Sequence, residues 1–185
     1  MKPRPSQIIL RARRLLKPGT VLDIGVGNGD NALYLGEKGF SVIGIDHNEK
    51  LINDLINRAK ELGVADQVKV ETADVLKYAF GKYENIICNF VLHFLPVEQF
   101  KATLDKIKAA TVPGGINVIS VFTKEGLLYD ANVKGYWLEK GELSGFYADW
   151  EIIHYEEATG YTRELDDDGY PKYQLSAHII ARKSL

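Results

Sequence analysis

Two residue periodicities alternate along most of this sequence, and their alternation constrains the fold more than any other feature. Short apolar runs such as TVLDIG (20–25) and FSVIGID (40–46) are typical of buried strands. Leucine and isoleucine recur every three or four residues in NEKLINDLINRAKELG (48–63), which predicts a helix ending at Gly63. Strands that take turns with helices form parallel sheets. The sequence therefore predicts an α/β domain.

The same alternation continues to residue 122. QVKVETAD (67–74) and YENIICNF (83–90) predict two more strands, and apolar residues at helical spacing over 97–107 predict a helix. VPGG (112–115) is expected to end that helix before the strand INVISVF (116–122). Crossovers between parallel strands are right-handed, so we expect helices on both sheet faces and ligands at the carboxyl ends of the strands.

After residue 122 the pattern changes. Residues 124–140 carry several aromatic side chains and read either as a lid over the strand ends or as a connector whose rings pack on the sheet. GELSGFYADW (141–150) predicts a helix, and WEIIHYEE (150–157) and YQLSAHIIARK (173–183) predict an antiparallel strand pair joined through DDDGYP (166–171). We expect one domain over 1–185, made of a basic N-terminal helix or arm (1–19), a ligand-binding core (20–122), the lid or connector with its helix (123–149) and the strand pair (150–185).

The composition argues against several classes of function. A formal net charge of −2 over 185 residues gives no sign of a nucleic-acid partner. The apolar run NIICNFVLHFL (85–95) is far shorter than the roughly 20 residues that cross a bilayer, and the basic N-terminus lacks the apolar core of a secretory signal. We therefore expect a cytoplasmic protein without a membrane contact. The basic residues of the N-terminal segment are read as a solvated helix face in preference to an RNA-binding arm (Arg4, Arg11, Arg13, Arg14, Lys17).

Cys88 is the single cysteine of the sequence, so no disulfide can form within it. Its neighbours are apolar, which indicates a buried thiol rather than a nucleophile or a metal ligand. We expect neither redox chemistry nor a metal site.

A loop with three alternating glycines follows the first strand in TVLDIGVGNGD (20–30). A strand, a glycine-rich turn and a helix would suit a dinucleotide, but that fingerprint needs a glycine where this chain has Asp30. A second acid, Asp23, precedes the loop. Each carboxylate would oppose a diphosphate by roughly 1 to 4 kcal/mol at about 4 Å, whereas both would attract a cation. The glycines would let the backbone approach such a ligand without a Cβ in the way.

S-adenosylmethionine is a cationic ligand with a ribose diol and an adenine, and polar residues follow the next three strands in positions that suit its parts. Asp46 ends VIGID (42–46), where its carboxylate can accept both ribose hydroxyls. Asp74 follows the third strand, where it can accept from the adenine amino group. Asn89 and Phe90 follow the fourth strand, beside the loop.

The acids also have a purely structural reading. Asp23 can bond to loop amides, Asp30 can complement the dipole of the following helix, and Asp74 can cap a turn. Taken singly, the two readings are equally good, but together, in strand register, the acids favour a ligand. The predicted cofactor site comprises Asp23, Gly25, Gly27, Gly29, Asp46, His47, Asp74, Val75, Asn89 and Phe90.

At these residues the sequence resembles the class I S-adenosylmethionine-dependent methyltransferases. VLDIGVGNGD (21–30) resembles the first motif of that superfamily, VIGID its second and TAD (72–74) its third, while YENIICNFVLHFL (83–95) and VPGG resemble its fourth and fifth. The match runs from about Thr20 to Phe122. It implies a Rossmann-like fold, with a mostly parallel seven-stranded sheet and an antiparallel final strand, and S-adenosylmethionine as the cofactor.

A narrower resemblance is to the tellurite-resistance methyltransferases, the TehB-like family. It rests on the domain size, on NALYLGEKGF (31–40), on EKGELSGFYADWEIIHYEE (139–157) and on the closing ARK. The resemblance implies a cytoplasmic enzyme that methylates chalcogen oxyanions such as tellurite and selenite. The family's proposed catalytic groups include a His-Arg pair between the last two strands and a further Arg in the final strand, where this chain has Arg163, Glu164 and Leu175. The resemblance therefore implies the cofactor site but not the catalytic groups.

Two residues are candidates for catalysis, and each has an alternative. His93 follows the fourth strand near the expected methyl group, yet it also reads as a packed histidine at a helix start. Arg163 can hold an anionic acceptor with its planar guanidinium, or it can be a solvated turn residue. Tyr129, Tyr136 and Trp137 can shield the sulfonium or cover the acceptor with their aromatic faces.

The predicted function is methyl transfer to a small molecule, with a metalloid or chalcogen oxyanion as the leading acceptor. One alternative is an N-, O- or S-methyltransferase of an organic metabolite, and another is a sensor that binds the cofactor without turnover. The retained Arg163 favours an anionic acceptor, whereas the missing histidine favours either alternative. The sequence does not predict the oligomeric state.

Overall fold

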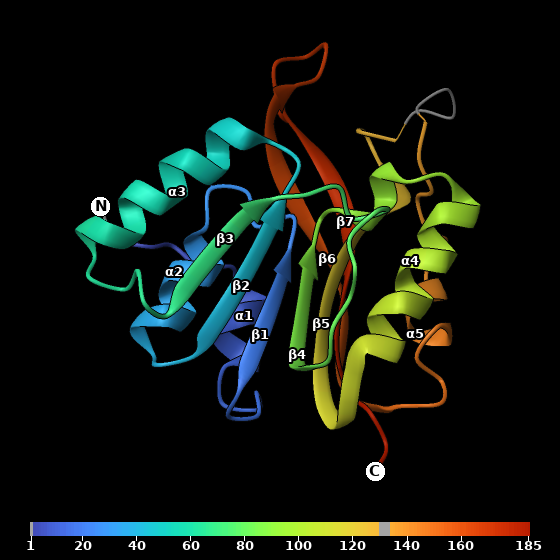
Figure 1. Cartoon of the computed structure of the whole chain (residues 1–185). Coiled ribbons are helices and arrows are strands. Elements are labelled where there is room, and N and C mark those ends of the chain that lie inside the picture. The colour runs from blue at the N-terminus through green and yellow to red at the C-terminus, as the bar shows by residue number, and fades with distance from the viewer. Residues whose placement is uncertain (1, 130–133) are drawn as a thin grey trace.

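A seven-stranded sheet with the order β3-β2-β1-β4-β5-β7-β6 forms the centre of the protein (Figure 1). The computed structural model describes residues 2–129 and 134–185, apart from the side chains of residues 162–164. Four successive residues of β1 are buried, which is typical of a central strand covered on both faces. The strands are β1 (Thr20–Ile24), β2 (Ser41–Asp46), β3 (Val68–Thr72), β4 (Tyr83–Asn89), β5 (Thr111–Gly126), β6 (Glu151–Leu165) and β7 (Pro171–Arg182).

The direction of the strands confirms the predicted fold class. β1 pairs in parallel with β2 and β4, and β3 and β5 continue the parallel sheet on either side. β7 runs antiparallel to both β5 and β6, so the last strand of the chain is the reversed one. The carboxyl ends of the parallel strands therefore meet along one edge of the sheet, which is the upper edge in Figure 1.

Helices cover both faces of the sheet (Figure 1). They are α1 (Gln7–Ala12), α2 (Asp30–Glu37), α3 (Glu49–Glu61), the 3₁₀ helix η1 (Leu92–Phe94), α4 (Val97–Ala110) and α5 (Glu142–Gly145). One apolar cluster contains the buried residues of α1, α2 and α3, and a second contains those of α4 and α5. α3 begins where the Asn48 side chain accepts from two backbone amides, and it ends before Gly63, whose φ is +69°.

β5 is longer at both ends than the strand expected over 116–122. It begins directly after α4, so VPGG (112–115) lies inside the strand rather than in a separate turn. The backbone is held there by β7's continuation, because Gly114 N donates to Lys183 O and Lys183 N donates to Gly115 O, both at 2.9 Å. These partners are far away in the sequence, which is why a turn signal alone did not predict them.

The helix expected over 141–150 is shorter, and the last two strands are longer. Helical structure in this segment is limited to α5, and turns follow it. Tyr147 is drawn into the core there and accepts a hydrogen bond from the Asn117 side chain (3.1 Å). β6 and β7 run past the expected strands, and Figure 1 shows their hairpin rising beyond the edge at which the parallel strands end.

The basic N-terminal segment packs on the sheet through α1. Ile8, Ile9 and Ala12 are buried. Arg11 is exposed, and its Nη1 lies 2.7 Å from Nε2 of His154. α1 therefore has one buried and one solvated face.

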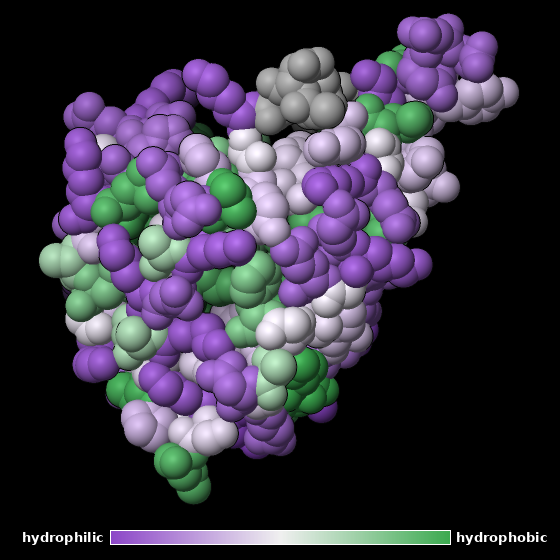
Figure 2. Space-filling model, turned by 90° about the vertical axis from the view of Figure 1, so that its right-hand side faces the viewer, coloured by the Kyte–Doolittle hydropathy of each residue, from purple (hydrophilic) through white to green (hydrophobic). Residues whose placement is uncertain are grey.

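The surface carries mixed side chains. Figure 2 shows polar residues over most of the visible face, with apolar residues scattered among them and the hairpin projecting at its top. That hairpin exposes the side chains of Tyr161, Leu165 and Tyr170. Within the described residues, no helix has the length and the apolar character that a membrane span needs.

Candidate functional site

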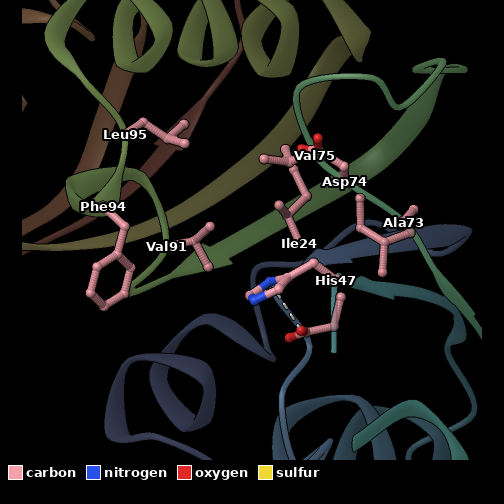
Figure 3. A pocket seen from close by; sticks show the side chains of 11 residues that line it. Ile24, His47, Ala73, Asp74, Val75, Val91, Phe94 and Leu95 are labelled. Atoms are coloured by element: carbon pink, nitrogen blue, oxygen red, sulfur yellow. Dashed lines mark ion pairs between the residues drawn. The ribbon is translucent and has the colours of Figure 1, made fainter. Parts of the chain in front are cut away.

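A cavity of about 630 Å³, here called the strand-end cavity, lies where β1, β2 and β3 end. Its volume is in the range of small-molecule sites, and this edge of a parallel sheet is where such sites form. Figure 3 shows Val91, Phe94 and Leu95 on the segment after β4, with Ala73 and Val75 across from them. The lining residues are Ile24, Gly25, Ile45, Asp46, His47, Ala73, Asp74, Val75, Val91, Phe94 and Leu95.

The three loop glycines have different surroundings. A Cβ on Gly25 would lie 2.1 Å from Val91 Cγ2, and a Cβ on Gly29 would lie 2.1 Å from Leu55 Cδ1, so packing alone requires glycine at both positions. Gly27 has a φ of +55°, and a Cβ there would come no closer than 3.8 Å to the nearest atom, Gly25 O. Open space above a glycine with positive φ is what the approach of a ligand to the backbone needs.

The Asp46 carboxylate is held in a fixed position at the edge of the cavity. Its Oδ2 accepts from Gly27 N at 3.0 Å, and its Oδ1 accepts from Asn48 N at 2.9 Å. Asp46 Oδ1 also lies 3.5 Å from Nδ1 of His47, and a dashed line at His47 in Figure 3 marks this contact. Each carboxylate oxygen can accept a second hydrogen bond, so Asp46 remains able to bind a diol.

Asp23 is buried near the end of β1, and its Oδ2 has no hydrogen-bond partner among the described residues. Burial, with a smaller contribution from the nearby Asp46 carboxylate, raises the pKa of Asp23 to about 7. A buried carboxylate without a partner is unfavourable unless it is protonated or next to a cation. Neither Asp23 nor Gly27 is among the residues that line the cavity. Because the oxygen is covered by protein, the carboxyl would act on a positively charged ligand through its charge rather than by direct contact.

Asp30 was expected to add negative charge beside the glycine loop, but in the structure it is paired with a cation. Its Oδ1 accepts from Arg58 Nη2 at 2.7 Å, and Nη1 of the same guanidinium reaches Asn28 O. The cation neutralises Asp30 at the start of α2. The carboxylates that remain beside the loop are therefore Asp23 and Asp46, rather than the expected pair of Asp23 and Asp30.

Asp74 both caps a turn and lines the cavity. Its Oδ1 accepts from Leu76 N at 2.9 Å, and its carbonyl accepts from the amides of Lys77 and Tyr78. Asp74 is exposed, and Val75 beside it is half-buried in the same wall. The structural reading of Asp74 holds here, and it leaves the residue in reach of a ligand in the cavity.

Asn89 ends β4 and Phe90 follows it directly. Asn89 Nδ2 donates to Ser6 Oγ at 3.4 Å, whereas its buried Oδ1 has no partner among the described residues. Phe90 packs against Phe122, with 4.8 Å between the ring centres. Neither residue is part of the cavity lining.

His93 is fully buried in η1 among aromatic rings. Its ring centre lies 4.2 Å from that of Phe94 and 4.6 Å from that of Phe122. Burial lowers the pKa of His93 to about 4, so the imidazole is neutral at neutral pH. Neither ring nitrogen has a hydrogen-bond partner among the described residues.

Residues 134–138 pack on η1 and β5. Tyr136 N donates to His93 O at 3.0 Å, and the Trp137 ring stacks on that of Phe122 with 5.4 Å between centres. Trp137 is 7% exposed, and its Nε1 is unpartnered in the part of the chain that the structure describes. This part of the expected lid or connector therefore lies against the sheet, and residues 130–133 are outside the described residues.

Arg163 lies in β6 within the projecting hairpin, and its side chain is outside the described residues. The structure therefore does not place the expected guanidinium relative to the cavity.

The apolar wall of the cavity is not among the residues predicted from the sequence. Ile24, Ile45 and Ala73 each stand directly before a predicted site residue, so strand register contained a signal for them. Phe94 is 63% exposed, which is unusual for so large an apolar residue, but no sequence pattern marks it. The missed residues are Ile24, Ile45, Ala73, Val91, Phe94 and Leu95.

Known proteins match this chain over nearly its whole length. The family model described as "Tellurite resistance protein TehB" matches residues 3–176. The "Probable S-adenosyl-L-methionine-dependent methyltransferase TehB" of Haemophilus influenzae is 30% identical over 178 residues, which are 95% of this chain and 61% of that protein. "Hemagglutinin 1" of Eikenella corrodens is 28% identical over 177 residues, which are 95% of this chain and 58% of that protein.

The fold is also that of a solved relative. The crystal structure of TehB from Haemophilus influenzae superposes with a TM-score of 0.86 at 26% identity, over 97% of this chain and 63% of that one. This chain thus spans about three fifths of the length of the relatives it matches.

Proposed function

Because this chain belongs to the TehB family of tellurite resistance proteins, we propose that it is a methyltransferase that uses S-adenosylmethionine and acts on a small molecule. One observation carries the proposal. The buried Asp23 carboxyl has an unpartnered oxygen and lies close enough to Asp46 to have its pKa raised by it, at the start of a glycine loop with open space above Gly27. A cation bound there relieves the cost of the buried carboxylate, and S-adenosylmethionine is a cation.

Residues of the strand-end cavity fit the parts of this cofactor. Asp46 would accept the ribose hydroxyls, and Asp74 with Val75 would hold the adenine against the apolar wall. The methionine part would lie over Gly27, where its charge reaches Asp23. A dinucleotide would instead place a diphosphate beside two carboxylates, which repel it.

The bound cofactor would supply a methyl group on a sulfonium, which an acceptor takes by in-line displacement. The chain has to align the acceptor and keep water out, and orientation of this kind can contribute about 7 to 11 kcal/mol. A general base adds about 10² to 10⁴-fold, and only where the acceptor must lose a proton. A strong base is therefore not a requirement of the site.

We consider two classes of acceptor. The description of the family names tellurite resistance, which favours a chalcogen oxyanion as the acceptor, and Arg163 would hold the charge of that acceptor. The aromatic rings around the neutral His93 favour an uncharged organic acceptor instead. Incubation with S-adenosylmethionine and selenite, tellurite, thiols or amines, with S-adenosylhomocysteine as the product measured, separates the two. Tight cofactor binding without turnover of any acceptor would contradict the proposed methyltransferase activity and indicate a sensor.

Gly27→Ala is expected to weaken S-adenosylmethionine binding by about tenfold or more, because the added methyl group occupies space through which the ligand approaches. The fold should survive, since a non-glycine residue with positive φ costs about 1 to 2 kcal/mol. Gly39→Ala is the matched control: Gly39 has a φ of +85°, open surroundings and a position before β2, at the opposite edge of the sheet. Calorimetric titration measures both affinities. An equal loss in the two variants would remove Gly27 from the proposed site.

If the acceptor is the oxyanion, Arg163→Ala is expected to raise the KM for selenite or tellurite by about tenfold, because the acceptor loses a charge-assisted pair of hydrogen bonds. The KM for S-adenosylmethionine should be unchanged. Steady-state kinetics with each substrate varied in turn measures both constants. If both constants rise equally, Arg163 has no specific role at the acceptor.

A further inference from the structure

Buried polar atoms without a hydrogen-bond partner gather in one part of the protein. Among the described residues, the side chains that carry such atoms are those of Asp23, Asn89, His93 and Trp137. Asp23 is explained by the proposed cofactor. Of the other three, Asn89 ends β4, His93 follows it in η1, and the Trp137 ring lies 5.6 Å from the His93 ring. Since most buried polar side-chain atoms in folded proteins have partners, this cluster of exceptions needs a reason.

The two ring nitrogens of His93 make no hydrogen bond within the described residues, so the polarity of this side chain does not stabilise the fold. A neutral imidazole has one N–H donor and one acceptor nitrogen, and each costs about 1 to 3 kcal/mol when it is buried without a partner. A phenylalanine of similar shape would pack among the same rings without this cost. The imidazole is therefore better explained by a ligand than by packing.

Trp137 presents a second unpartnered group to the same place. Its ring centre lies 5.6 Å from that of His93, and its Nε1–H can only donate. Phe122 stacks against Trp137 and packs on His93, which makes the surroundings flat and apolar. The two polar groups are thus set among aromatic rings.

The backbone at this place is strained. Phe90, directly after β4, has a φ of +59°, and it is the one non-glycine residue with positive φ in the part of the chain described. Such a conformation costs roughly 1 to 3 kcal/mol and tends to persist at ligand sites. Its ring lies 6.4 Å from that of His93, in the same aromatic group.

Phe94 separates His93 from the strand-end cavity. Its ring lines the cavity, is 63% exposed and lies 4.2 Å from the His93 ring. Exposed side chains change rotamer within nanoseconds. A change of the Phe94 rotamer would uncover the side of the His93 ring that Phe94 now contacts.

We infer that Asn89, His93 and Trp137 form the acceptor subsite of this protein, and that it takes a planar, uncharged acceptor that carries a hydroxyl or thiol group. The inference rests on the proposed function. The aromatic rings suit a flat apolar body, while the unpartnered polar atoms suit one neutral polar group. An oxyanion would lose its hydration there without gaining a cation from these residues.

The transfer balances with these groups. The acceptor oxygen or sulfur forms a bond to the methyl carbon while the bond from that carbon to the sulfonium breaks, and the bonding electron pair stays on the cofactor sulfur. The acceptor becomes cationic as it is methylated and so loses its proton to the imidazole nitrogen that accepts its hydrogen bond. The proton then passes to water.

The test uses His93→Phe and Trp137→Phe, which remove the polar atoms and keep flat aromatic rings. Trp150→Phe is the control, since Trp150 is buried in the core beside Tyr147 and does not line the cavity. The acceptor probes are 2-naphthol and thiophenol, with selenite and tellurite for comparison. Thermal unfolding, calorimetry and formation of S-adenosylhomocysteine are measured for each variant.

We expect His93→Phe without ligand to be at least as stable as the wild type, because unpaired buried atoms are removed. Affinity for S-adenosylmethionine should be unchanged, while kcat/KM for the planar probes falls by about tenfold or more in both variants and not in Trp150→Phe. The planar probes should also raise the Tm of the wild-type complex with S-adenosylhomocysteine, and not that of the two variants.

Three results would overturn the inference and leave the proposed function standing. One is turnover of selenite or tellurite but of neither planar probe. Another is turnover of the planar probes that neither variant reduces. The third is a wild-type complex whose Tm the planar probes do not raise. A wild-type protein that does not bind S-adenosylmethionine would contradict the proposed function itself.

Discussion

Asp46→Ala is expected to weaken S-adenosylmethionine binding by about 100-fold, which is about 2.8 kcal/mol. In the proposed complex the carboxylate accepts two ribose hydroxyls, and a hydrogen bond to a charged group contributes about 1.5 to 3 kcal/mol. The protein holds this acceptor ready through the amides of Gly27 (3.0 Å) and Asn48 (2.9 Å). Because the Asp46 carboxylate is already held in place, binding costs no further ordering of this side chain. The free energy of its hydrogen bonds to the ribose should therefore be lost in full when Asp46 is replaced. Calorimetric titration measures this loss of affinity.

The same substitution removes two bonds that hold the loop, so stability has to be followed separately. Asp46→Asn keeps the size of the side chain and shows whether the charge itself matters. Asp66→Ala is a surface control, because the Asp66 side chain is 99% exposed. Thermal unfolding without ligand reports any change in the fold. If Asp46→Ala keeps wild-type affinity, Asp46 is not a ligand of the ribose.

Binding of S-adenosylmethionine is expected to release a proton from Asp23. In the free protein, burial and Asp46 raise the pKa of Asp23 to about 7, so the carboxyl is mostly protonated at pH 6. A bound cation favours the carboxylate and lowers that pKa. Affinity should therefore fall by about tenfold or more as the pH is lowered from about 7 to about 5.5, because protonation of Asp23 then competes with binding. Calorimetry in buffers of different ionisation enthalpy counts the released proton.

Asp23→Asn is the control for this linkage, since its side chain does not titrate. Its affinity should be weaker near neutral pH, and this component of the pH dependence should be absent. In the protein without ligand, the pH dependence of folding stability has the opposite sign to the pH dependence of ligand affinity. A carboxyl with a raised pKa stabilises the fold while protonated and loses that contribution as the pH rises through about 7. At pH 8 the ligand-free Asn variant should therefore unfold at a higher temperature than the wild type. Equal pH profiles for the two proteins would contradict the assignment of Asp23.

The parallel core was predictable because its signals are local. Successive buried residues in β1 mark a strand covered on both faces. The periodicity over 48–63 marks α3, whose Ile52, Leu55 and Ala59 face the sheet. Asn48 at the start and Gly63 past the end mark its boundaries through elementary capping chemistry.

The helices and strands whose bounds differ from the sequence prediction depend on contacts between residues that are far apart in the sequence. VPGG carries a turn signal, yet Gly114 and Gly115 pair with Lys183 and become part of β5. The segment after α5 has apolar residues at helical spacing, but its path follows the burial of Tyr147, whose hydroxyl bonds to Asn117. Pairing and burial of this kind override local propensity.

The candidate site shows the same division. Strand register placed Asp46 and Asp74 at the carboxyl ends of neighbouring strands, and both line one cavity. Asp30 has the residue type and the position in the sequence that a site residue would have, and only the structure shows that Arg58 neutralises it. The surroundings of His93 likewise depend on Trp137, which lies far along the chain, so its missing hydrogen-bond partners could not be inferred from the sequence.

The central claim is that carboxylates beside an open glycine loop select a cationic adenosyl compound over a phosphorylated one. The most direct test is calorimetric titration of the wild-type protein with S-adenosylmethionine and with NAD in the same buffer at neutral pH. The account predicts that S-adenosylmethionine binds with release of a proton and that NAD neither binds nor competes with it. Tighter binding of NAD, displaced only weakly by S-adenosylmethionine, would contradict the account.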